Sequence, residues 1–111
     1  MTLAEFVQWL KTPGLNHFLI LSALLFSFGI YAILSRRNAI MVLMGIELIL
    51  NAAALNFVLF SRLFGDVHAQ AFALFIIALA ACEAVVGLAV IISLARTTHT
   101  VFADEVNLLK G

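Results

Sequence analysis

Glu47 and Glu83 are the two residues of this 111-residue chain whose type and setting point most directly to chemistry. Each lies inside a long apolar run, "GIELILNAAALNF" (45–57) and "ALAACEAVVGLAV" (78–90). Burial in apolar surroundings favours the neutral acid over the carboxylate, so such a group can bind and release a proton near neutral pH. Neither run contains a basic residue. The pattern therefore predicts proton exchange at both glutamates, with water or another protein chain as the partner.

Two other roles are open to these carboxyl groups. A protonated glutamate can hold membrane helices together as a hydrogen-bond donor without exchanging its proton. An ion site would need further oxygen ligands at matching spacing, and Asn51, four residues after Glu47 on the same helix face, supplies one. We favour proton exchange, with Asn51 as a supporting polar group, because two glutamates at similar depth are harder to explain as structural than one.

The composition shows which elements must position the glutamates. Hydrophobic residues make up 65% and charged residues 11% of the chain, and the mean hydropathy is +1.18. Soluble proteins are about 45–50% apolar, and a soluble chain of this length has too little interior for more. A net charge of zero excludes a basic surface for nucleic acid. The single cysteine, Cys82, is expected to be buried and cannot form an internal disulfide.

Three apolar runs are long enough to cross a membrane. Apart from the two glutamates, they extend for 24, 24 and 29 residues without Asp, Glu, Lys or Arg, and a spanning helix needs about 20. The sequence therefore predicts an all-α integral membrane protein. We expect a single membrane domain over 1–111, with transmembrane helices at about 17–35, 39–61 and 70–95 and a C-terminal tail over 96–111.

The first residues predict a short amphipathic helix over about 2–11, lying in the membrane interface. The stretch "TLAE" (2–5) fits a capping box, and "PG" (13–14) ends the helix. Trp9 is expected to anchor the helix at the interface. Its apolar face is formed by Leu3, Phe6, Val7 and Leu10.

With three spans, the loop 35–38 and the C-terminus share one side of the membrane. Arg36 and Arg37 in this very short loop favour the cytoplasmic side, which places the N-terminus outside. Counting at about 1.5 Å per residue from Arg36 and Arg37 puts Glu47 roughly 15 Å deep, and counting from Arg96 on the same side puts Glu83 roughly 20 Å deep. We therefore expect both carboxyls near mid-depth, offset by about one helical turn, and neither facing lipid.

Three stretches, 21–57, 73–96 and 107–111, match a known family. They contain both glutamates, the arginine pair followed by Asn38, and the pattern "ELxLNAxxLNF" (47–57), in order. On these residues the chain resembles the small K-type, or 4L-type, membrane subunit of respiratory complex I (NADH-quinone oxidoreductase) and its photosynthetic relatives. The resemblance implies three transmembrane helices, an outside N-terminus and a place in a membrane arm that couples quinone reduction to proton translocation.

The resemblance also implies roles for particular residues. In that family the glutamates of the second and third helices lie on a hydrated polar path, and they map onto Glu47 and Glu83. The basic pair of the first loop maps onto Arg36 and Arg37. The resemblance covers the chain from about residue 17 and implies nothing for the residues before it.

The chain alone is expected to have no catalytic, cofactor-binding or metal-binding residues, because no motif for them occurs. FMN and iron–sulfur clusters are expected in partner subunits, and quinone elsewhere in the complex. The expected partners are antiporter-like and small hydrophobic subunits of the membrane arm. A bacterial inner membrane is favoured, and thylakoid or mitochondrial inner membranes also fit.

Three alternatives compete with this interpretation. The small C-type subunit of multisubunit cation/proton antiporters has the same size and spans, but that family lacks the paired glutamates. Small subunits of membrane-bound hydrogenases are also similar to this sequence. The third alternative is a purely structural membrane spacer.

Overall fold

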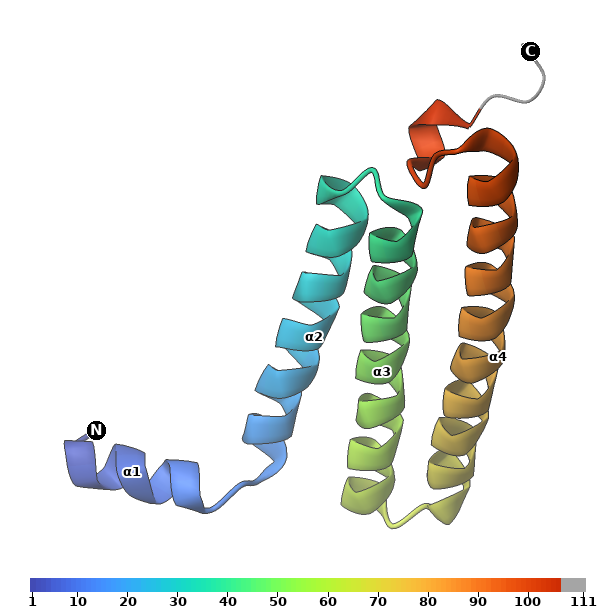
Figure 1. Cartoon of the computed structure of the whole chain (residues 1–111). Coiled ribbons are helices and arrows are strands. Elements are labelled where there is room, and N and C mark those ends of the chain that lie inside the picture. The colour runs from blue at the N-terminus through green and yellow to red at the C-terminus, as the bar shows by residue number, and fades with distance from the viewer. Residues whose placement is uncertain (107–111) are drawn as a thin grey trace.

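The computed structural model describes residues 1–106, which form four α-helices and a terminal 3₁₀ turn (Figure 1). The stretch "NLLKG" (107–111), which contributes to the family resemblance and ends the predicted tail, lies outside the described residues. The elements are α1 (Leu3–Lys11), α2 (Leu15–Ser35), α3 (Ala39–Phe64), α4 (Val67–Thr98) and η1 (Ala103–Glu105).

Helices α2, α3 and α4 are long and apolar enough to cross a membrane, with 21, 26 and 32 residues. At 1.5 Å per residue, α2 is about 32 Å long, close to the ~30 Å of hydrocarbon in a bilayer. The prediction of an all-α chain with three spanning helices and a short helix before them is confirmed. The helices extend two or three residues beyond several predicted ends, because residues between them serve as caps.

The caps follow from side-chain chemistry at the helix ends. The backbone N–H of Glu5 donates to Thr2 Oγ1 at 3.2 Å, and that of Thr2 donates to Glu5 Oε2 at 2.7 Å, which completes the predicted capping box. Asn38 Oδ1 caps α3. Gly65, with φ of 68°, ends α3, and Asp66 caps α4 directly after it.

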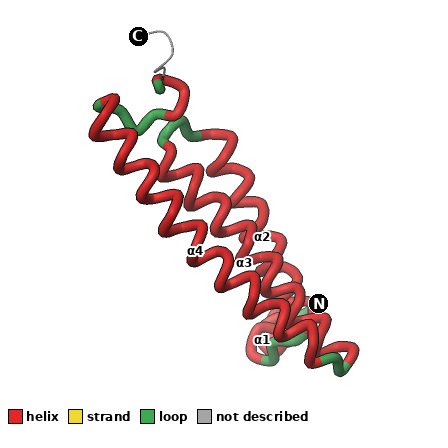
Figure 2. Tube along the Cα trace, turned by 90° about the vertical axis from the view of Figure 1, so that its right-hand side faces the viewer, coloured by secondary structure: helices red, strands yellow, loops and turns green. Residues whose placement is uncertain are grey.

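The three long helices lie side by side in one layer, with α3 between α2 and α4 (Figures 1 and 2). The molecule measures 62 × 36 × 16 Å, so the layer is one helix thick. At the contact of α2 with α3, a Cβ added to Gly29 would lie 2.7 Å from the backbone oxygen of Gly45. A Cβ added to Gly45 would lie 2.8 Å from that of Gly29. Two glycines therefore let these backbones touch.

Small residues also dominate the rest of the buried set. The most buried apolar residues include Ala52 and Ala54 of α3 and Ala73 and Ala80 of α4. The large apolar side chains point outward instead. In the apolar segments of the three long helices, only 6–22% of the residues are buried within the chain. Both faces of the layer must therefore be covered by lipid or by other protein chains.

Candidate functional site

The contact between Leu43 of α3 and Gly87 of α4 sets the register of these two antiparallel helices. A Cβ added to Gly87 would lie 3.0 Å from Leu43 Cδ1. Glu47 lies four residues after Leu43, and Glu83 lies four residues before Gly87. Because the helices run in opposite directions, both steps of about 6 Å lead to the same height. The two membrane glutamates therefore lie level with each other on neighbouring helices.

The expected offset of one helical turn between the glutamates was wrong. That expectation requires Arg96 to lie level with Arg36 and Arg37. Ala39, the first residue of α3, instead lines the same cavity as Ile91 of α4. Arg96 lies five residues further along α4, or about 7 Å beyond the start of α3.

Glu47 lies on the face of α3 that contacts α4, since it is one turn from Leu43. Its side chain is half-buried. Among the described residues, its Oε1 atom is buried and has no hydrogen-bond partner. An unpaired buried carboxyl oxygen is unfavourable. Glu47 Oε1 is therefore an unsatisfied polar atom in the part of the chain that the structure describes.

Glu83 lies beside the contact stripe of α4 rather than within it. Ala80 is buried, Ala84 and Gly87 are half-buried, and Glu83 is exposed. Cys82 is exposed as well, so the expectation that it is buried was wrong. The reason is the single layer, which leaves the sides of α4 away from α3 uncovered. Glu83 can avoid lipid only if a neighbouring chain covers it.

Asn51 and Asn56 place further polar groups on α3. Asn51 follows Glu47 by one turn, but its side chain is exposed on the surface of the layer. Asn56 was not among the predicted site residues. Its Oδ1 is buried without a hydrogen-bond partner in residues 1–106. Asn56 lines two cavities. One of about 310 Å³ lies near the start of α4, and one of about 340 Å³ is shared with residues of α2.

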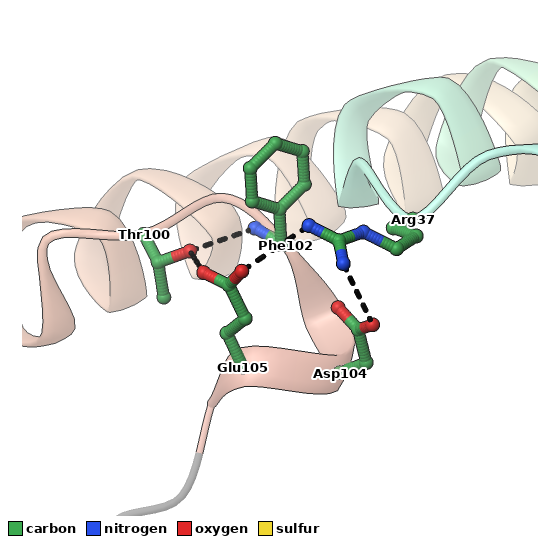
Figure 3. Close-up of polar contacts among 5 residues, drawn as sticks. All are labelled: Arg37, Thr100, Phe102, Asp104 and Glu105. Atoms are coloured by element: carbon green, nitrogen blue, oxygen red, sulfur yellow. Dashed lines mark hydrogen bonds and ion pairs between the residues drawn. The ribbon is translucent and has the colours of Figure 1, made fainter.

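The C-terminal segment contacts Arg37, the second arginine of the first loop (Figure 3). Arg37 forms ion pairs with Glu105 at 3.2 Å and with Asp104 at 3.7 Å. Its guanidinium carbon also lies 4.7 Å from the ring centre of Phe102. Within the described part of the chain, Arg36 has no ion pair. The two arginines thus have different surroundings although they are adjacent.

Backbone hydrogen bonds hold the same two segments together. The N–H of Ala39 donates to the oxygen of Val101 at 2.9 Å, and the N–H of Ala103 donates to that of Arg37 at 3.1 Å. Thr100 Oγ1 also donates to Glu105 Oε2 at 2.9 Å. The first loop and the tail therefore lie at the same end of the molecule, as three spans require.

Sequence reasoning missed the acidic partners of Arg37. Asp104 and Glu105 are adjacent acids in the tail, on the same predicted side as the adjacent arginines. That match of charge and side was the signal that could have found them. In the described residues, no group of three or more His, Cys, Asp or Glu side chains is placed to hold a metal ion.

Comparison with known proteins gives one consistent result. The family model described as NADH-ubiquinone/plastoquinone oxidoreductase chain 4L matches residues 17–111. The NADH-quinone oxidoreductase subunit K of Chlorobaculum parvum is 50% identical over 97 residues, covering 87% of this chain and 92% of the relative. That of Bordetella pertussis is 51% identical over 101 residues, covering 90% of this chain and 99% of the relative. The chain therefore belongs to the chain 4L, or subunit K, family of NADH-quinone oxidoreductases.

Proposed function

We propose that this chain is the small membrane-arm subunit of a proton-translocating quinone oxidoreductase of the complex I type. Its electron donor would be NADH or a related reductant such as NADPH or ferredoxin. Glu47 and Glu83 would exchange protons as quinone is reduced elsewhere in the complex. The observation that carries this proposal is the register of α3 and α4, which sets both carboxyls at one height.

The geometry supports proton transfer between these groups through a short bridge. Axes of packed helices lie about 8–10 Å apart. Because Glu83 is exposed beside the contact, a side chain of a neighbouring subunit or a chain of water molecules would connect the two glutamates. In each transfer an O–H bond breaks on the donor and another forms on the acceptor. The electrons of the reduction move through other subunits. A water molecule between the helices would supply the hydrogen-bond partner that Oε1 of Glu47 lacks among the described residues.

Arg36, Arg37 and Asn51 are proposed as supporting residues. Arg37 holds the tail against the first loop through its ion pairs. Arg36 is left to face a neighbouring subunit or the aqueous phase. Asn51 extends the polar surface of α3 by one turn from Glu47. None of the three is proposed to exchange protons itself.

We propose that the chain lies in a bacterial inner membrane, with the N-terminus outside and the C-terminus in the cytoplasm. The support is the arginine pair in the first loop, which shares its end of the molecule with the tail. Antiporter-like and small hydrophobic subunits would cover the exposed side of α4 around Glu83. FMN and iron–sulfur clusters would belong to partner subunits, and this chain would catalyse no redox step alone.

Identification of the partner chains tests this proposal. The intact assembly is purified in mild detergent, and its other chains are identified by mass spectrometry. We expect subunits that carry FMN and iron–sulfur clusters, together with antiporter-like membrane subunits. Cation/proton antiporter subunits without redox chains would overturn the proposal, as would hydrogenase subunits or a fully active lone chain of 12.1 kDa.

A further inference from the structure

The short helix α1 turns away from the N-terminal end of α2 rather than continuing in line with it (Figure 1). The ring of Trp9 stacks on that of His17, with centroids 3.8 Å apart and an interplanar angle of 29°. His17 Nδ1 accepts the backbone N–H of Gly14 at 3.2 Å. The stacking spans the three-residue connection 12–14, and the hydrogen bond holds the His17 ring at the start of α2.

One face of α1 is apolar and uncovered by the rest of the described chain. Leu3 is 80%, Phe6 43% and Leu10 52% exposed, and Val7 is 39% exposed. Glu5, Gln8 and Lys11 lie on the other side of the helix. A continuous stripe of large apolar side chains is unfavourable in water, so something must cover it.

We propose that the headgroup layer of the bilayer covers this face of α1. Three linking residues reach at most about 10 Å, so α1 lies close to the plane where α2 begins. Because α2 is about as long as the hydrocarbon is thick, that plane is the edge of the hydrocarbon. A helix lying across this edge places its apolar stripe among the upper acyl chains.

Two further features favour lipid as the occupant. Trp9 lies at the corner between α1 and α2, and tryptophan is enriched where helices enter the membrane interface. The charges of Glu5 and Lys11 cancel, so uncharged lipid surfaces suffice and anionic lipids are not required. Helix α1 lies before residue 17, where the family match begins. Its position at the lipid surface does not depend on proton exchange at the glutamates.

Photocrosslinking in the intact complex tests the inference. Benzoylphenylalanine, which inserts into nearby C–H bonds, replaces Phe6 in native membranes, with Gln8 on the polar face as the matched control. We expect lipid adducts several times more abundant at Phe6 than at Gln8, with unchanged quinone-dependent proton pumping. The same probe at Val7 gives a second reading if the first variant assembles poorly, and Leu3 gives a third.

Adducts to another protein chain at these positions would overturn the proposal and assign the face to a partner subunit. An absence of adducts at both positions would show that α1 lies in water, and equal lipid-adduct yields at Phe6 and Gln8 would show that no one face of α1 is turned to lipid; either result would overturn the proposal. Neither result would affect the proposed roles of the membrane glutamates, which are tested separately.

Discussion

Leu43 and Gly87 face each other so closely that a Cβ on Gly87 would lie 3.0 Å from Leu43 Cδ1. This contact sets the register of two antiparallel helices. Glu47 lies one turn after Leu43 on α3, and Glu83 lies one turn before Gly87 on α4. The glutamates therefore lie at one height on neighbouring helices, with Glu47 in the contact of α3 with α4 and Glu83 beside it. Alanine substitutions at the glycines in the helix contacts should therefore lower the amount of assembled complex to different degrees, according to what the added methyl group meets.

Gly29→Ala and Gly45→Ala should each destabilise the contact of α2 with α3. The new methyl group would lie 2.7 or 2.8 Å from a backbone oxygen, which cannot move without shifting a helix. Overpacking of this kind costs about 1–3 kcal/mol. The measurement is the amount of assembled complex and its thermal stability in native membranes.

Gly87→Ala is the matched control for these variants. Its methyl group meets only the tip of Leu43, a flexible side chain, and alanine within a helix gains about 0.5–1 kcal/mol over glycine. We expect nearly normal complex content. Equal tolerance of alanine at all three positions would contradict the close backbone approach of α2 and α3.

Arg37→Glu should loosen the tail from the first loop by placing like charges beside Asp104 and Glu105. Exposed ion pairs contribute only about 0.2–1 kcal/mol, so the expected effect is faster proteolysis of the tail rather than loss of the complex. Adding Glu105→Arg should restore protection, because the pair is remade with reversed charges. Limited proteolysis of membranes from the side that carries the first loop and the tail measures this.

The adjacent arginine provides the control for the charge reversal. When Arg36→Glu is combined with Glu105→Arg, the tail should not regain protection from proteolysis, because the structure pairs Glu105 with Arg37 rather than with Arg36. Equal rescue at both arginines would mean that the tail responds to general charge rather than to this contact.

Asp66 should make the start of α4 sensitive to acid. The backbone N–H of His68, and next its side chain, hydrogen-bond the carboxylate and lower the pKa of Asp66 below its ordinary value of 3.8. The stability that this cap adds is therefore present above pH 3.8 and is lost as the pH falls through the lowered pKa. Asp66→Asn keeps a capping oxygen and should remove this pH dependence.

The effect is measured by thermal unfolding of the full chain in detergent. Helix content is monitored during unfolding at several pH values in this acidic range. The same acid sensitivity in Asp66→Asn would assign it to other carboxyls. Asp66→Ala, which lacks any capping oxygen, should be less stable than Asp66→Asn at every pH.

The sequence was sufficient to predict the long helices and to locate two glutamates within them, because hydropathy and intramembrane charge are local properties. The role of the glutamates stays a prediction. Helix ends differed where Gly65 and Asp66 act as caps. The exposure of Cys82 and Glu83 could not be predicted, because burial depends on how many helices surround α4. The ion pair of Arg37 with Glu105 joins residues 68 positions apart, a separation that local patterns do not connect.

The central claim is that the carboxyls of Glu47 and Glu83 exchange protons. Glu47→Gln and Glu83→Gln keep the side-chain volume and much of the hydrogen bonding, but glutamine cannot exchange a proton in the working pH range. Glu5→Gln in α1 is a matched control, because glutamine also completes a capping box. Glu47→Asp should retain more function than Glu47→Gln, since a water chain can bridge one methylene.

The most direct test is quinone-dependent proton uptake by membrane vesicles that carry Glu47→Gln, with complex content quantified in the same samples. Positioned acid–base groups contribute about 10²–10⁴-fold to proton transfer. We therefore predict normal complex content with coupled proton uptake reduced at least about tenfold, a smaller loss in Glu83→Gln, and none in Glu5→Gln. Full proton uptake by Glu47→Gln at normal complex content would contradict the account, as would a loss of complex that parallels the loss of activity.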